Sequence, residues 1–107
     1  MTTSTGLKHP RHLNSLSYYH ACLRLLIDSV RAGLSHASIA KALNASQLPS
    51  PAGAKWSTAS VKQALHRIQT PDRPSRLYYA LARLHLVGML SLADCQVLTQ
   101  RGYSDSL

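Results

Sequence analysis

The chain has 107 residues, enough for one domain but not for two independent cores. It carries 12 Lys and Arg against 4 acidic residues, which gives a formal net charge of +8. So few carboxylates exclude glycosidase-like chemistry and carboxylate-rich divalent-metal sites, because both need clustered acids. A basic balance of this size is typical of proteins that bind nucleic acid or another acidic partner. A charge that only keeps the surface soluble is the alternative.

Neither a secretion signal nor a membrane span is predicted. The first five residues lack the basic and apolar pattern of a signal peptide. The longest apolar run, residues 77–89, is interrupted by Arg83 and His85 and is too short to cross a bilayer. We therefore expect a cytoplasmic protein, associated with the bacterial nucleoid when bound to DNA, that makes no contact with a membrane.

The cysteines and histidines do not predict chemistry. Cys22 and Cys95 are the only cysteines, and both fall on apolar helix stripes, as buried reduced thiols do. The spacing of His9, His12, His20 and Cys22 fits no standard zinc pattern. We expect no metal site, no cofactor and no catalytic residue.

Taken in chain order, the sequence predicts an all-α fold. Residues 1–14 are polar and basic without periodicity, which favours a flexible arm that touches phosphate, or else simply a frayed terminus. A single helical domain follows over residues 15–102, and residues 103–107 form a loose tail. Apolar spacing of three and four predicts about five helices, over residues 15–32, 35–46, 57–68, 76–90 and 91–102.

Small residues mark where these helices begin and end. Serines at positions 15 or 17, 35, 57 and 75 are suited to cap helix N-termini, and the third helix is expected to start at Ser57 or Thr58. Ser91 with Asp94 resembles a capping box. Gly33 suits the left-handed conformation that ends a helix. The prolines and glycine of residues 47–56 exclude helix there, and Trp56 is expected to pack on the core.

The last two helices, within residues 76–101, are strongly apolar and are candidates for pairing two copies of the chain. Leu77, Leu81, Leu84 and Val87 or Gly88 form one predicted stripe, which Leu86 widens. Leu92, Cys95 and Leu98 form the stripe of the following helix. In each tyrosine pair, residues 18–19 and 78–79, one ring is expected to face the core and the other the surface.

The third helix carries the strongest functional signal. Val61, Ala64, Leu65 and Ile68 define its inner face, and the opposite face is polar and free of acids. Gln binds adenine through two hydrogen bonds, and Lys and Arg reach guanine or phosphate, so such a face fits the major groove of DNA. An ordinary solvated helix face is the equal alternative.

A further pattern runs through residues 33–68. Its positions are Gly33-Leu34-Ser35, Ile39-Ala40, Leu43-Asn44, Leu48-Pro49, Pro51-Ala52-Gly53, Trp56-Ser57, Val61 and Leu65. This pattern resembles the DNA-binding recombinase domain of large serine recombinases. The resemblance implies a helix-turn-helix over residues 35–69 with an extended Pro/Gly loop, whose second helix enters the major groove. It implies that the positions nearest the bases are Thr58, Ala59, Lys62, Gln63 and His66.

Another set of residues is expected nearer the phosphates: Lys41, Lys55, Ser57, Ser60 and Arg67. No stretch upstream of residue 33 is suited to be the catalytic serine domain of that family, so we expect a protein that is not an enzyme.

The sequence therefore predicts a small stand-alone regulator, a repressor from a phage or another mobile element, that binds double-stranded DNA as a homodimer. The alternative is a protein-binding inhibitor or adaptor on the same fold, for example a phage-encoded inhibitor of a host nucleic-acid-binding complex.

Overall fold

A computed structural model describes residues 15–70, 72 and 74–99. This part of the chain contains five helices and no strand, so the predicted all-α class is confirmed. The helices are α2 (Leu16–Arg31), α3 (His36–Ala45), α4 (Thr58–Ile68), α5 (Arg76–Leu86) and α6 (Leu92–Thr99). The predicted arm, the tail and the end of the last helix at residues 100–102 lie outside the described residues.

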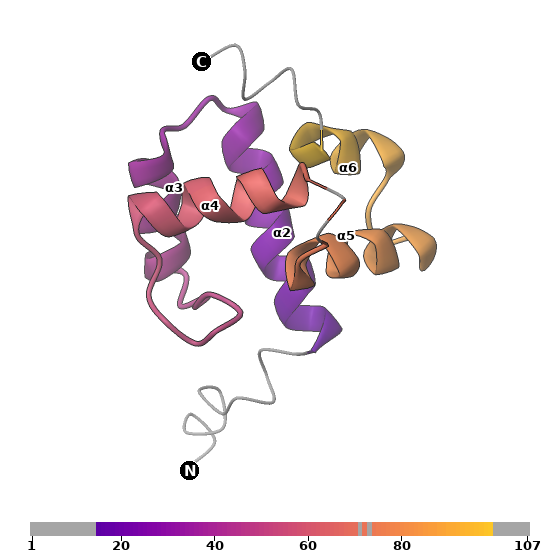
Figure 1. Cartoon of the computed structure of the whole chain (residues 1–107), viewed down its shortest axis with the longest axis horizontal. Coiled ribbons are helices and arrows are strands. Elements are labelled where there is room, and N and C mark those ends of the chain that lie inside the picture. The colour runs from indigo at the N-terminus through magenta and orange to yellow at the C-terminus, as the bar shows by residue number, and fades with distance from the viewer. Residues whose placement is uncertain (1–14, 71, 73, 100–107) are drawn as a thin grey trace.

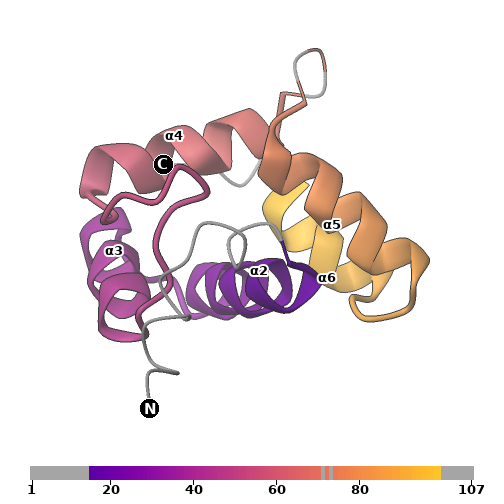
Figure 2. The same ribbon diagram turned by 90° about the horizontal axis from the view of Figure 1, so that it is seen from below.

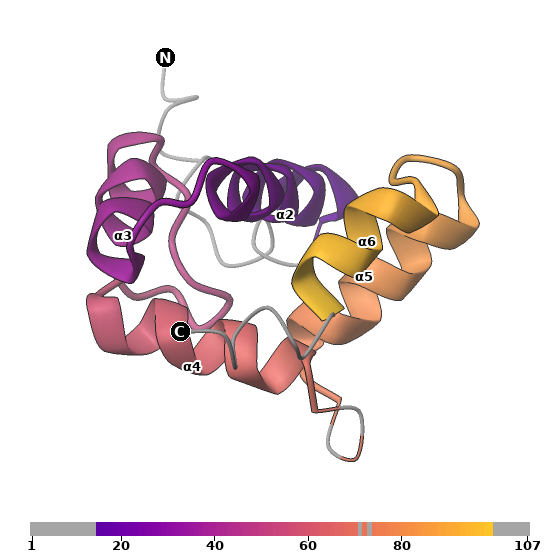
Figure 3. The same cartoon turned by 90° about the horizontal axis from the view of Figure 1, so that it is seen from above.

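Helix α2 is the centre of the fold. It packs against α3, α5 and α6, while α4 lies across the core and contacts α3, α5 and α6 (Figure 1). Seen along a perpendicular direction, α2 and α4 face each other from opposite sides of the core, with α3 at one end and the α5–α6 pair at the other (Figures 2 and 3). This arrangement leaves the outer side of α4 uncovered by the other four described helices.

The predicted caps are present. Ser15, Ser35, Ser57 and Ser75 each accept a hydrogen bond from the backbone N–H three residues on, which satisfies a donor that the helix itself leaves unpaired. Ser91 and Asp94 exchange the two bonds of a capping box, at 3.1 and 3.0 Å.

Three helices end in the same way, with a backbone N–H reaching back five residues. These bonds join Leu34 to Ser29, Leu48 to Leu43 and Met89 to Leu84. Such an ending needs one residue in the left-handed region, and Gly33 and Gly88 supply it at φ +74° and +83°. After α3 the same position is taken by Gln47 at φ +58°, the only non-glycine residue with positive φ in the described part of the chain.

Gly88 also explains where the sequence prediction for the fourth helix is wrong. The expected helix continues to residue 90, but α5 ends at Leu86 because Gly88 turns the chain. Val87 therefore lies beyond the helix and is 55% exposed. Leu86, in the last turn of α5, and Leu92, at the start of α6, are also outside the core, at 83% and 59% exposed.

The two tyrosine pairs behave differently. Tyr18 and Tyr19 are both buried, so the expectation of one surface ring there is wrong. Their rings pack edge to face, with the ring centroids 5.0 Å apart. The Tyr18 hydroxyl donates to the Pro49 carbonyl, which satisfies the hydroxyl of this buried phenol. In the other pair Tyr79 is exposed and Tyr78 is half-buried, as predicted.

Cys22 and Cys95 are free and buried, as the sequence predicts. Burial raises the pKa of the Cys22 thiol to about 12, and burial likewise raises that of Cys95. Both thiols are therefore protonated at neutral pH, which is the state of an inert structural cysteine.

Candidate nucleic-acid interface

Helix α4 is held against α3 by apolar contacts from both. Ile39 and Leu43 of α3 and Val61 and Leu65 of α4 are buried in one core, along with Ile68. Because these side chains take up one side of α4, the opposite side must face solvent. The predicted base-proximal residues are all exposed: Thr58, Ala59, Lys62, Gln63 and His66. Ala59, Gln63 and His66 lie on the side opposite the core, Lys62 lies at its flank, and Thr58 is exposed at the N-terminal tip of the helix on the side of Val61.

The loop between α3 and α4, residues 46–57, is fixed by side chains. Asn44 accepts a hydrogen bond from the Trp56 N–H and donates one to the Trp56 carbonyl, each at 2.9 Å. The indole N–H of Trp56 donates to the Leu48 carbonyl at 2.7 Å, and the ring is 5% exposed, so the predicted packing of Trp56 is confirmed. These bonds join the end of α3 to the start of α4.

Sequence reasoning missed the role of Asn44. It was one position of the recombinase-like pattern, next to buried Leu43, and nothing in periodicity distinguishes it from a solvated amide. The sequence signal for this role is the pair itself: a polar residue, Asn44, near the end of one helix and an aromatic residue, Trp56, just before the next. Together they form the clamp that sets the direction of α4.

The N-terminus of α4 is built without acidic residues. Ser57 accepts from the Ser60 N–H at 3.1 Å, and the Ser60 hydroxyl accepts from the Ser57 N–H at 2.8 Å. The Ser60 hydroxyl is thus already engaged in capping. No acid occupies the first turn, so the positive end of the helix dipole is not neutralised there by the chain itself.

The predicted phosphate contacts are spread around this helix. Lys41 is exposed on α3, on the side away from Ile39 and Leu43. Lys55 is exposed in the loop immediately before Trp56, and Arg67 is exposed in the last turn of α4. Residues 29–71 contain no Asp or Glu, so every charged side chain of the loop and of the two helices that it joins is basic.

The carboxylates lie elsewhere and most of them are paired. Arg24 contacts Asp28 at 3.0 Å and Asp94 at 3.1 Å, and Arg31 contacts Asp94 at 3.1 Å. The hydrogen bond from Arg24 and the Ser91 N–H lower the pKa of Asp94 to about 2. Asp72, in the connector between α4 and α5, is the one other acid in the described part of the chain.

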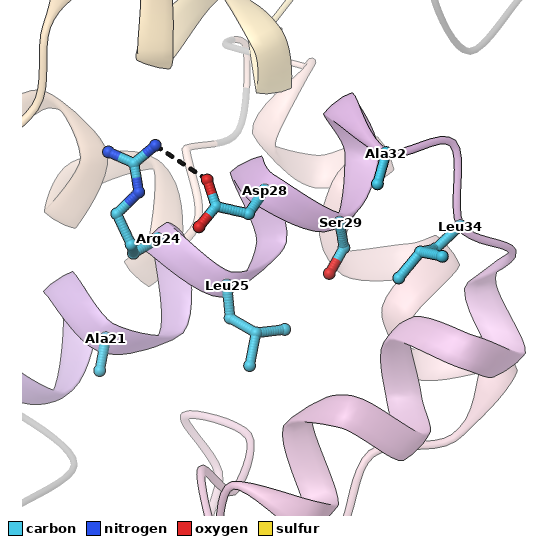
Figure 4. A pocket seen from close by; sticks show the side chains of 7 residues that line it. All are labelled: Ala21, Arg24, Leu25, Asp28, Ser29, Ala32 and Leu34. Atoms are coloured by element: carbon cyan, nitrogen blue, oxygen red, sulfur yellow. Dashed lines mark hydrogen bonds and ion pairs between the residues drawn. The ribbon is translucent and has the colours of Figure 1, made fainter.

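Figure 4 shows the α2 side, where Asp28 turns toward Arg24 beside a shallow pocket of about 400 Å³. Leu25, Ala32 and Leu34 also line this pocket, and its only charged groups are the paired Arg24 and Asp28. It offers no free cation to a polyanion.

A larger groove of about 700 Å³ runs beside α4. Its walls are the loop around Pro51, the side of α4 that carries Gln63 and Arg67, and the start of α5 with Arg76. The Arg76 guanidinium donates to the Pro51 carbonyl at 3.3 Å, and both residues line the groove. Two arginines and an amide therefore converge in a cleft next to the exposed face of α4.

Residues 19–68 match the model of the family described as Recombinase. The match confirms the resemblance that the sequence predicts and extends it upstream of residue 33 into α2. This recombinase segment, residues 19–68, comprises most of α2 together with α3, the loop and α4, whereas α5 and α6 lie outside it. No curated protein and no solved structure matched the chain.

The match points to a DNA-related role for the segment. It gives no sign of the catalytic part of a recombinase, which is compatible with a protein that is not an enzyme. In the described residues, no group of three metal-ligating side chains is present. None of the helices there is long and apolar enough to span a membrane.

Proposed function

We propose that this protein is a sequence-specific binder of double-stranded DNA whose recombinase segment acts as a helix-turn-helix with an extended loop. The observation that carries the proposal is the exposed, acid-free face of α4 beside the basic groove, held in one orientation by the Asn44–Trp56 clamp. A rigid helix with free amide and ammonium groups is what direct readout in the major groove requires.

Within this proposal the residues have distinct roles. Lys62, Gln63 and His66 face the base edges, with Thr58 and Ala59 at the tip of the helix. Lys41, Lys55, Ser57, Ser60 and Arg67 lie nearer the backbone and set position rather than sequence. DNA binding of this kind occludes a promoter, and the recombinase resemblance points to a mobile element. We therefore propose a repressor from a phage or another mobile element, located in the cytoplasm at the nucleoid.

A second copy completes the proposed regulator. Leu86, Val87, Met89 and Leu92 are all exposed around the α5–α6 turn, and we call these four residues the apolar turn. They are at the opposite end of the molecule from α3, so pairing through them leaves the α4 face of each copy open (Figures 1 and 3). Two linked α4 helices would read a two-fold symmetric site.

The same apolar turn supports the alternative function. A protein-binding adaptor would use an exposed apolar cluster to hold a partner other than its own copy. Sedimentation equilibrium of the protein and of a Leu86→Glu variant tests this. A dimer that the variant loses supports pairing; a monomer in both removes the dimer from the proposal and favours the adaptor.

The function itself is tested by selecting random duplexes with the purified protein near physiological salt, where phosphate binding alone is weak. We expect an enriched motif that Gln63→Ala relaxes at one position. The matched control is Gln96→Ala, which removes the same amide from the exposed surface of α6. An unenriched pool, or a motif that Lys62→Ala and Gln63→Ala together leave unchanged, would reject α4 as the reading helix.

A further inference from the structure

Helix α5, outside the recombinase segment, carries a second set of cations that the proposed function does not use. Arg76, Tyr79 and Arg83 are all exposed and are spaced by three and four residues, so they share one face of the helix. We call these three residues the α5 strip. Tyr79 is 63% exposed, the most exposed aromatic ring in the described part of the chain.

The α5 strip lines a hollow of its own. A pocket of about 460 Å³ lies between the start of α2 and α5, with walls from Leu16, Tyr19, Arg76, Tyr79, Ala80 and Arg83. Two guanidinium groups, an exposed phenol and an apolar floor make this a surface for phosphate and sugar rather than for a cation or a purely apolar ligand.

Neither arginine of the α5 strip is neutralised. Among residues 15–70, 72 and 74–99 every ion pair is made by Arg24 or Arg31. Arg76 also stands in the first turn of α5, which contains no acid, so its charge adds to the positive end of that helix. Such a placement is unfavourable by itself and becomes favourable when an anion binds there.

The α5 strip is continuous with the α4 surface. Arg76 lines both the pocket beside α2 and the groove that contains Gln63 and Arg67. A line of cations therefore runs from Arg67 through Arg76 to Arg83. Since a polyanion that follows α4 would meet Arg76 next, the two helices present one extended surface to a single ligand.

We propose that the α5 strip binds the sugar–phosphate backbone of the same duplex whose bases α4 reads. Arg76 and Arg83 are seven residues apart, which is about 10 Å along a helix. That length corresponds to roughly three nucleotide steps of one strand. The two guanidinium groups hold phosphates at the ends of this interval, and the Tyr79 hydroxyl donates to a phosphate between them.

This inference rests on the proposed function. It predicts that variants of the α5 strip change the salt dependence of DNA affinity, whereas variants of α4 change the selected motif. Each phosphate contact contributes about 0.9 to the slope of log affinity against log salt. The double variant Arg76→Gln/Arg83→Gln should lower that slope by about 2 and weaken binding to all duplexes at least tenfold near physiological salt, while the selected motif stays the same. Tyr79→Phe should have the smallest effect, because it removes one hydrogen bond to phosphate but no charge.

The control is Arg31→Gln, compared with Arg83→Gln alone. Both remove one positive charge, but Arg31 is paired with Asp94 on the α2–α6 side. An equal loss of affinity in these two variants would mean that net charge alone acts, and would overturn the inference. Circular dichroism of each variant shows that the helices are intact.

Hydroxyl-radical footprinting locates the contact. The wild type should protect about three backbone positions beyond the α4 contacts, and the double variant should lose that protection alone. An unchanged footprint and slope in the double variant, with Gln63→Ala still relaxing the motif, would overturn the α5 strip and leave the proposed function standing. If the double variant lost binding to single strands but not to duplexes, the assignment of the α5 strip to a duplex would also be overturned.

Failure of the proposed function has a different signature. In that case Lys62→Ala and Gln63→Ala leave the selected pool unchanged, whatever the double variant does. A drop in salt slope without any sequence preference would keep the α5 strip as a phosphate surface and reject α4 as a reader.

Discussion

Two polar sides of this molecule are stabilised by different interactions, ion pairs on one side and hydrogen bonds between neutral groups on the other. On the α2–α6 side, Arg24 and Arg31 are paired with Asp28 and Asp94. On the α4 side, the chain is fixed by neutral hydrogen bonds, from Asn44 and Trp56 and within the loop itself, where the Ser50 N–H donates to the Ala54 carbonyl at 2.8 Å.

The difference shows where the net charge of +8 is available. Ion pairs on the α2–α6 side neutralise two arginines, so those cations contribute little to the field outside the protein. On the α4 side, the one cation that holds the loop is Arg76, through the Pro51 carbonyl and not through an acid, and Lys62 and Arg67 remain free to meet a polyanion. A purely solubilising charge would not need this division.

The largest effect is expected from placing acids on the α4 face. Lys62→Glu/Gln63→Glu should lower affinity for the selected duplex about 100-fold or more, because two base contacts worth about 1–3 kcal/mol each are lost and phosphates are repelled. Fluorescence anisotropy with a labelled duplex measures this. Gln96→Glu puts an acid on α6 instead and should change affinity less than threefold; a comparable loss there would mean that the two sides do not differ.

The next largest effect is expected on stability, from removing the hydrogen bonds between Asn44 and the Trp56 backbone. Asn44→Ala leaves both polar groups of the Trp56 backbone without their partner and should cost about 2 kcal/mol of unfolding free energy. Urea denaturation measures it. Asn44→Asp keeps the acceptor and loses the donor, so its unfolding free energy should lie between those of the wild type and Asn44→Ala. Wild-type stability in Asn44→Ala would show that the loop does not depend on the clamp.

The sequence predicts most of this fold because its helix signals are local. Capping serines and Gly33 act on backbone groups within a few residues, so spacing alone locates those ends. The predicted fourth helix is too long because apolar spacing continues through Val87. The helix ends at Leu86, because the backbone turns at Gly88. Periodicity reports which residues repeat, but it does not report where the backbone turns.

The candidate site is less accessible to sequence reasoning, since it depends on contacts between distant residues. The exposed face of α4 follows from helical geometry once Val61 and Leu65 are assigned inward. The Asn44–Trp56 clamp, and the Tyr18 hydroxyl on the Pro49 carbonyl, join residues 12 and 31 positions apart. Polar pairs at such separations leave no periodic trace.

A smaller, stabilising effect is expected at the end of α3. Gln47 occupies the left-handed position that glycine fills after α2 and α5. Gln47→Gly should raise the unfolding free energy by about 0.5–1 kcal/mol, because the strain of a side chain at positive φ is removed. Thermal denaturation measures the gain. Ala45→Gly, within α3, is the matched control and should destabilise instead.

The smallest effect is expected from the ion pairs of the α2–α6 side. The Asp94 side chain is 14% exposed and meets two arginines, yet the arginines themselves are 35% and 45% exposed, so solvent screens the pairs. Asp94→Asn should therefore destabilise the protein less than Asn44→Ala does. The pKa of Asp94 is lowered to about 2 in the folded protein, below the ordinary value of 3.8.

A lowered pKa in the folded state means that the carboxylate stabilises the fold above the ordinary pKa, and that this contribution disappears as the pH falls toward the folded value. The difference in unfolding free energy between wild type and Asp94→Asn should thus be constant near neutral pH and shrink between about pH 4 and pH 2. Urea denaturation across this range measures it. A pH-independent difference would mean that neither the two arginines nor the Ser91 N–H favours the charged form of Asp94 in the folded protein. The ion pairs of the α2–α6 side would then not restrain its arginines, and these would be as free to bind a polyanion as Lys62 and Arg67.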